Sequence, residues 1–195
     1  MPDIKSILGA LSAVLLLFGY IPYIRSVITG HTKPHVFSWF IWSTFTCVAF
    51  LAQTVKGAGP GSWMVGFETI AYLTVFVLAF KKGTRKFDVL DWITLLFAIL
   101  AIVLWITTNR PVLAAILVSI GDAVGFIPTY RKGYRKPFEE HLGPYAFGTI
   151  ASICAVLAVS QYSLTTWLYP FTLILTNGTF AATLLVRRRR IPLPA

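Results

Sequence analysis

The sequence predicts an all-α integral membrane protein of seven transmembrane helices, and three observations favour this fold class. Of the 195 residues, 56% are hydrophobic and only 12% are charged, and the mean hydropathy is +0.74. A soluble domain of this length cannot enclose so many apolar side chains, so a bilayer must contact them. The apolar stretches are also continuous, which is typical of membrane helices and not of β-barrel strands. Finally, lysine and arginine gather in alternate connecting loops.

Seven apolar segments are separated by clusters of glycine, proline and charged residues. Each segment has enough residues to cross roughly 30 Å of hydrocarbon, and the sixth is the shortest. In chain order they are 6–28, 35–55, 62–80, 88–108, 112–130, 143–160 and 164–186.

The distribution of lysine and arginine predicts the orientation of these segments. Of the 17 lysines and arginines, 14 fall on one side, and the other side holds Lys5, Lys56 and Arg110. Cytoplasmic loops retain an excess of these residues. We therefore expect the N-terminus outside and the C-terminus in the cytoplasm. The expected location of this multi-pass protein is the plasma membrane, or the inner membrane in a bacterium.

The net charge of +10 does not indicate a nucleic-acid partner, because the cations lie in short loops and not on a soluble face. The basic run 187–190 is expected to contact anionic lipid headgroups. No enzyme, cofactor or metal site is predicted, since the chain lacks a nucleophile elbow and a phosphate-binding glycine loop. His31 and His35 have metal-ligand spacing, but Pro34 interrupts a helix between them.

The two halves of the chain show an internal repeat. Gly-Tyr-Ile-Pro at 19–22, followed by Arg25, recurs as Gly-Phe-Ile-Pro at 125–128, followed by Arg131, at an offset of 106 residues. Further pairs at offsets of 107 and 108 are Phe40 with Phe147, Cys47 with Cys154, and Gln53 with Gln161. The first three helices therefore correspond to the last three, and the fourth is a linker that keeps the two repeats parallel. The predicted units are a first repeat at 1–86, a linker helix at 87–110, a second repeat at 111–190 and a tail at 191–195.

This arrangement, with a proline motif near the cytoplasmic end of the first helix of each repeat, resembles the SWEET and PQ-loop transporter superfamily. Residues 33–38 are loosely similar to the continuation of that motif, although Tyr23 and Thr129 replace its glutamine. The resemblance implies alternating access around a central site for a small polar solute, such as a sugar, an amino acid or a related metabolite. Some relatives act as sorting receptors, so a non-transporting receptor or assembly protein is the alternative function.

Two carboxyl groups lie within predicted spans, Asp122 near the middle of the fifth and Glu68 in the third. Burying a charge there costs at least about 2.5 kcal/mol, so such residues usually face a cavity, a partner or a proton path. We expect Asp122, and Glu68 as second candidate, to bind a proton or a cationic group of the solute. Ser119 shares the face of Asp122. The alternative role is a neutral carboxyl that fastens two helices, and the sequence leaves proton coupling and facilitated diffusion both open.

Three further residues are expected at the solute site. The resemblance implies a binding role for Asn177 in the seventh helix, where an amide can also serve as an interhelical hydrogen-bonding group. Trp39 and Trp42 stand on the second helix, whereas Ala146 and Thr149 occupy the matching places of the sixth, and this asymmetry would give a one-sided stacking wall. Interfacial anchoring is the alternative for both tryptophans.

Pro22 and Pro128 each remove a helical hydrogen bond at equivalent places, so we expect them to act as paired hinges, with Pro144 completing the gate. A static kink is the alternative. Gly148 and Ala151 are small enough to pack either a homo-oligomer face or an internal contact, and the oligomeric state stays open.

Overall fold

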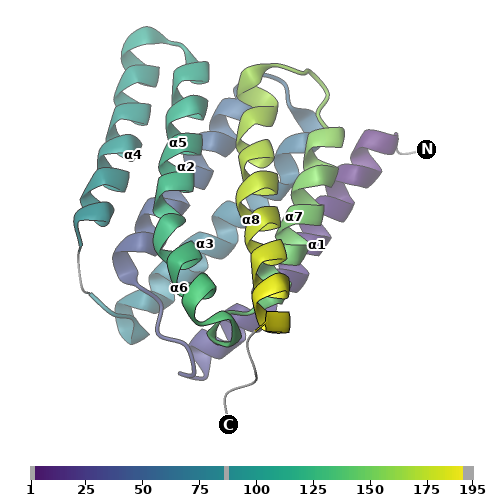
Figure 1. Cartoon of the computed structure of the whole chain (residues 1–195). Coiled ribbons are helices and arrows are strands. Elements are labelled where there is room, and N and C mark those ends of the chain that lie inside the picture. Colours follow the sequence, from purple (N-terminus) through teal and green to yellow (C-terminus); the bar gives the residue numbers. More distant parts are fainter. Residues whose placement is uncertain (1–2, 86–87, 191–195) are drawn as a thin grey trace.

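The computed structural model is an all-α bundle in which the helices run side by side between two ends (Figure 1). The structure describes residues 3–85 and 88–190. These residues form eight α-helices: α1 (Ile4–Ile28), α2 (Val36–Val55), α3 (Trp63–Lys82), α4 (Val89–Thr108), α5 (Pro111–Gly125), α6 (Ile127–Arg135), α7 (Leu142–Leu157) and α8 (Leu164–Arg190). Two short 3₁₀ helices, η1 (Gly59–Ser62) and η2 (Pro137–Glu139), precede α3 and α7.

The architecture is that of a helical, multi-pass membrane protein. Within the described residues, six helical stretches are long and apolar enough to cross a bilayer, with α5 and α6 counted as one stretch. The sixth predicted segment forms α7, whose 16 residues extend only about 24 Å at 1.5 Å per residue. Its crossing of the membrane stays a prediction.

Helix α4 shows most clearly which surfaces face lipid. It buries only Thr94, Ala98 and Ala101 and exposes large apolar side chains such as Ile99, Val103 and Ile106. Polar solvent would disfavour such a surface, whereas hydrocarbon matches it. In Figure 1 this helix stands at the edge of the bundle beside α5.

The helices pack in a regular order. Helix α3 lies against both α1 and α2, and α8 lies against both α5 and α7. Between these groups, α1 packs on α7 and α2 packs on α5. Helix α4 contacts α5 and, less extensively, α2. Gly148 faces the amide of Asn177 and Ala151 is fully buried, so both small residues serve internal contacts.

The two motif prolines have different effects on their helices. Pro22 lies inside the continuous helix α1, where its side chain is exposed, whereas the predicted helix 112–130 breaks at Phe126 and resumes as α6. Pro128 is in the first turn of α6, where its missing N–H is not needed for an intrahelical bond. The structure therefore has one broken and one continuous helix at the equivalent motifs.

The end of the bundle that carries the N-terminus is closed by contacts between loops. Lys5 Nζ donates to the carbonyl oxygen of Val159 at 2.8 Å, and the Ser160 and Gln161 N–H groups donate to the Ala58 and Gly57 carbonyl oxygens at 2.9 and 3.2 Å. Glycine permits this close approach, because a Cβ on Gly61 would lie 2.8 Å from the Val159 Cα. We call these contacts the N-terminal seal.

The opposite, basic end is held by different contacts. The Val36 N–H donates to the Thr84 carbonyl oxygen at 3.0 Å, which joins the loop before α2 to the loop after α3. Arg187 donates to the Tyr134 carbonyl oxygen and Arg188 to the Pro137 carbonyl oxygen, at 3.0 and 3.1 Å. Two of the four arginines expected to contact lipid headgroups therefore bind the chain itself, while Arg189 and Arg190 are exposed.

Most element boundaries lie within a few residues of the predicted ones, and the largest differences are the break at Phe126 and the extension of α8 to Arg190. The predicted boundary between the first repeat and the linker, at 86–87, and the tail at 191–195 lie outside the described residues.

Candidate functional site

A cavity of about 620 Å³ lies between the helices and extends from the basic end toward the middle of the bundle. Its walls are formed by α1, α2, α3, α5, α6, α7 and α8, but α4 contributes no lining residue among those described. Loop residues 31–35 and 140–141 lie at its mouth. Of the residues that the sequence predicts at the site, six line this cavity: Trp39, Trp42, Asp122, Pro128, Pro144 and Asn177.

One wall of the cavity is aromatic and comes from α1, α2 and α3. Trp39 packs edge-on against Trp42 and Tyr72, with ring centroids 5.4 and 5.1 Å apart. Tyr23 and Tyr20 extend this wall, at 5.3 Å from Trp39 and Tyr72 respectively. Trp39 is only 7% exposed, which is more burial than an interfacial anchor has. The tryptophans therefore belong to the cavity wall.

A second aromatic group faces the cavity from the other half of the chain. Phe180 on α8 packs against Phe126 and Tyr145, with centroids 5.4 and 4.6 Å apart. Tyr145 and Phe126 line the cavity. The sequence offset of 107 pairs Trp39 with Ala146, but the aromatic residue that lines the cavity from α7 is Tyr145. The cavity is therefore aromatic on two sides, although Trp42 has no aromatic counterpart at Gly148 or Thr149 on α7.

Two carboxyl groups line the cavity, and they differ in their partners. Glu140, at the mouth, forms an ion pair with Lys132 at 2.7 Å. Asp122, on α5, is 6% exposed and has one hydrogen bond, from the Tyr169 hydroxyl at the long distance of 3.5 Å. No basic side chain among the described residues pairs with Asp122. A buried carboxyl with so little compensation can take up a proton or a cationic ligand.

Polar groups of α8 line the same cavity as Asp122. Asn177 and Thr176 lie near the middle of that helix and both line the cavity. The Asn177 side chain makes no hydrogen bond to any described residue, whereas the Thr176 hydroxyl donates to the Thr172 carbonyl oxygen at 3.1 Å. An amide supplies two donors and an acceptor, so Asn177 can bind a polar solute group.

Glu68 does not line the cavity but lies behind its aromatic wall. It is 2% exposed, and its Oε1 accepts a hydrogen bond from the Tyr72 hydroxyl at 2.8 Å. The Tyr72 hydroxyl is also 2.8 Å from that of Tyr20, which lines the cavity. The second oxygen, Oε2, is buried without a partner. Two tyrosine hydroxyls thus connect the cavity to Glu68.

Two other predicted site residues lie away from the cavity. Ser119 is 5% exposed, and its hydroxyl donates to the Ala115 carbonyl oxygen at 2.7 Å, so it is engaged within its own helix. Pro22 is exposed on the outside of α1. Pro144, by contrast, packs at the crossing of α1 and α7, where a Cβ on Gly19 would lie 3.2 Å from its Cα.

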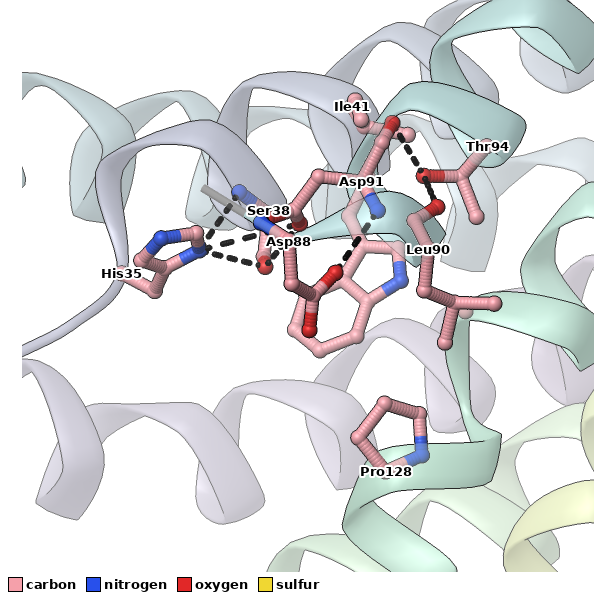
Figure 2. Close-up of a pocket in the computed structure, with 10 residues that line it drawn as sticks. His35, Ser38, Ile41, Asp88, Leu90, Asp91, Thr94 and Pro128 are labelled. Atoms are coloured by element: carbon pink, nitrogen blue, oxygen red, sulfur yellow. Dashed lines mark hydrogen bonds and ion pairs between the residues drawn. The ribbon is translucent and has the colours of Figure 1, made fainter. Parts of the chain in front are cut away.

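A side pocket of about 260 Å³ adjoins the cavity at the basic end and shares His35, Ser38, Trp42 and Pro128 with it. Figure 2 shows the His35 ring directed toward Ser38 and Asp91, with Pro128 on the opposite side of the pocket. His35 Nδ1 lies 2.8 Å from the Ser38 hydroxyl and 3.9 Å from Asp91. The pocket therefore joins the start of α2 to the start of α4.

Metal binding finds no geometric support among residues 3–85 and 88–190, where no group of three or more histidine, cysteine, aspartate or glutamate side chains is close enough to hold an ion. His31 bonds instead to the Thr29 hydroxyl, with its Nδ1 at 2.8 Å, and His35 accepts from the Ser38 N–H at the start of α2. The two histidines thus have local structural partners.

Sequence reasoning missed the tyrosines of the cavity. Tyr72 follows Glu68 by four residues and therefore shares its helix face, which was a usable signal. Tyr20 lies within the repeated motif, between Gly19 and Pro22. Glu140 and Tyr145 had no such signal. They reach the cavity from the loop before α7 and from the start of α7, and the positions of these segments depend on the tertiary packing.

Comparisons with known proteins find no relative: no family model matches the chain, and neither a curated protein nor a solved structure matches it.

Proposed function

We propose that this chain is a membrane transporter that moves a small polar solute by alternating access around the central cavity. The observation that carries the proposal is the cavity itself, which has Asp122 and the uncommitted Asn177 amide on its wall and loop residues of the basic end at its mouth. A carrier needs a solute site within the membrane that is reached from one side at a time.

The packing order supports the two-repeat plan that the resemblance to SWEET and PQ-loop transporters implies. In this plan α1 corresponds to α5, α2 to α7 and α3 to α8. The packing of α1 on α7 then corresponds to that of α5 on α2, and the packing of α3 on α1 and α2 corresponds to that of α8 on α5 and α7. His35 and His141 are the residues that precede α2 and α7, at the motif offset of 106. The place of α4 outside the cavity supports its role as a linker.

The contacts at the two ends support a state that is open at the basic end. The N-terminal seal closes the other end through Lys5 and the backbone of two loops. In the opposite state these hydrogen bonds would separate, and the helices would close around the mouth. The broken helix at Phe126, next to Pro128, is the place in the second repeat where α6 can swing relative to α5.

The charge distribution supports a cytoplasmic position for the open end. The positive-inside rule assigns the basic loops and the C-terminal arginines to the cytoplasm, and hence the N-terminal seal to the outside. The cavity then faces the cytoplasm of the cell, across the plasma membrane or a bacterial inner membrane.

Proton coupling is supported by the chain of hydroxyls that leads to Glu68. A buried carboxyl with an unpartnered oxygen can hold a proton, and Tyr72 and Tyr20 connect it with the cavity.

Counterflow in proteoliposomes tests the transport function. Solutes that stabilise the purified protein in thermal unfolding are chosen as cargo, since a ligand at a hundredfold excess over Kd stabilises by about 2.7 kcal/mol. We expect saturable uptake that Asn177→Ala abolishes. Thr179→Ala is the matched control on α8, because that exposed hydroxyl bonds only to carbonyl oxygens of its own helix. Absence of any saturable flux, together with a stable bound partner protein, would favour the receptor function instead.

A further inference from the structure

The charges around the cavity are unevenly distributed between its mouth and its depth. At the mouth, Lys132 is paired with Glu140, and Lys33 is exposed. Deeper in the cavity, Asp122 is the ionisable acid, and no described lysine or arginine accompanies it. A solute anion would find no free cation at this depth, whereas a solute cation would find a carboxylate.

The aromatic walls favour the same charge. Tyr20, Tyr23, Trp39, Trp42 and Tyr72 form one continuous group of contacting rings, and Phe126 with Tyr145 lies on the other side. Aromatic faces carry partial negative charge and attract ammonium groups, with tryptophan the most effective. A sugar would also stack on such rings and could donate hydroxyl groups to a carboxylate, but it brings no positive charge to compensate the buried negative one.

The polar groups of α8 indicate which chemical group the solute carries besides its charged one. The Asn177 amide has no hydrogen-bonding partner among the described residues, and it lines the same cavity as Asp122. It can bind a hydroxyl or carbonyl group at the other end of a solute whose cationic group lies against Asp122. A cavity of about 620 Å³ admits small organic molecules.

From this combination we infer that the solute is a small organic cation, an amine or quaternary ammonium compound, held by Asp122 and by the aromatic faces of Trp39, Trp42 and Tyr72. The inference rests on the proposed function, of which it specifies the substrate class. Anions and zwitterions are disfavoured, because no described lysine or arginine lies beside Asp122 to bind their negative group. Neutral sugars are disfavoured because they carry no positive charge.

Matched pairs of ligands test the inference by isothermal calorimetry on the full-length protein in detergent. Choline is compared with the neutral alcohol in which carbon replaces its nitrogen, and ethanolamine is compared with propanol. Shape is nearly constant within each pair, so the difference reports the charge. We expect at least one cation to bind about tenfold or more tightly than its neutral counterpart. Equal affinities within both pairs, or binding of neither member, would overturn the inference.

Variants of the wall locate the interaction. Asp122→Asn should reduce the preference for the cation to less than about threefold, and Trp42→Leu should weaken cation binding about fivefold while leaving the neutral alcohol unaffected. Trp167→Leu is the matched control, because that ring packs on Phe171 and does not line the cavity. If Asp122→Asn does not fold, the two measurements on Trp42→Leu still decide. A cation preference that is unchanged in Trp42→Leu would contradict the role of the aromatic wall in cation binding.

The two proposals fail in different ways. Saturable, Asn177-dependent flux of a neutral or anionic solute, without any ammonium binding, would refute the cation site and leave transport standing. Ammonium binding that requires Asp122 and Trp42 but never leads to flux would support the cation site and refute transport.

Discussion

At the scale of single residues, the two buried carboxyls are separated by the aromatic wall. Asp122 lines the cavity, where a solute can contact it. Glu68 lies behind Tyr72 and is connected with the cavity through tyrosine hydroxyl groups. A group that contacts the solute affects both solute binding and the transport rate. A group behind the aromatic wall can affect the coupling of transport to a proton gradient without affecting solute binding. The two carboxyls should therefore have separable effects on transport.

Glu68→Gln removes the group that can hold a proton and keeps the size of the side chain. In proteoliposomes we expect uptake by this variant to lose its acceleration by a proton gradient. The solute KM should stay unchanged, because Glu68 does not line the cavity. Thr74→Val serves as the control on α3, since the Thr74 hydroxyl is exposed and donates only to the Ile70 carbonyl oxygen. Gradient-driven acceleration that persists in Glu68→Gln would remove Glu68 from proton coupling.

Sequence reasoning identified Asp122, Asn177 and two tryptophans of the cavity but missed its tyrosines. Asp122 and Asn177 are recognisable because polar groups are rare and costly in apolar helices. Tyr20, Tyr72 and Tyr145 are not, since a tyrosine in a membrane helix is equally compatible with the lipid interface. Only the packing of α1, α2 and α3 brings the rings of Tyr20 and Tyr72 together.

At the scale of helices, α4 depends on its N-terminal cap, because few of its residues are buried. Asp88 accepts a hydrogen bond from the Asp91 N–H at 3.0 Å, and the Asp91 side chain accepts one from the Asp88 N–H, also at 3.0 Å. These bonds satisfy two backbone donors that a helix start otherwise leaves free.

Asp88→Ala should lower the free energy of unfolding by about 1 kcal/mol, the usual cost of losing such a cap. Thermal unfolding in detergent measures the effect. Asp88→Asn should retain the stability, because asparagine caps helices about as well as aspartate. An Asn variant as unstable as the Ala variant would show that Asp88 acts through its charge and not through the cap.

The N-terminal seal depends on close backbone contact at Gly61. A valine there would force its Cβ against the Val159 backbone, so Gly61→Val should loosen the seal and favour the state that is open at the N-terminal end. Cysteine labelling reads this out through Ser12→Cys, in a background where Cys47 and Cys154 are alanine, since Ser12 is fully buried with the seal closed.

We expect the Ser12 cysteine to react with an impermeant maleimide faster in Gly61→Val than in the parent. Gly143→Val is the control, because nothing lies within 4 Å of a Cβ at that glycine. Equal labelling rates in all three proteins would mean that the loop contacts do not govern access from this end.

The helices themselves were predictable because each apolar segment is bounded by charge, glycine or proline. The break at Phe126 was not, since Pro22 and Pro128 occupy equivalent places in the sequence. The two motifs differ in the charge that follows the proline. The part of α1 beyond Pro22 carries Arg25 alone, whereas the part of α6 beyond Pro128 carries Arg131, Lys132 and Arg135.

At the scale of the whole molecule, the termini are expected on opposite sides of the membrane. A fluorescent protein fused to the C-terminus should fold and fluoresce in the cytoplasm, and an epitope tag at the N-terminus should be accessible to antibody on intact cells. This arrangement follows from the 14 to 3 distribution of lysine and arginine. Both termini on one side would contradict it and would exclude α7 or another helix as a membrane span.

Cysteine accessibility in the middle of the cavity tests alternating access most directly. Thr176→Cys, in the background without Cys47 and Cys154, places one thiol on the cavity wall near the middle of α8. An impermeant maleimide is added to oriented vesicles from either side. We predict labelling from both sides, each slowed by the transported solute. Labelling from the basic side alone, with or without solute, would contradict a carrier and leave a cavity that opens in one direction only.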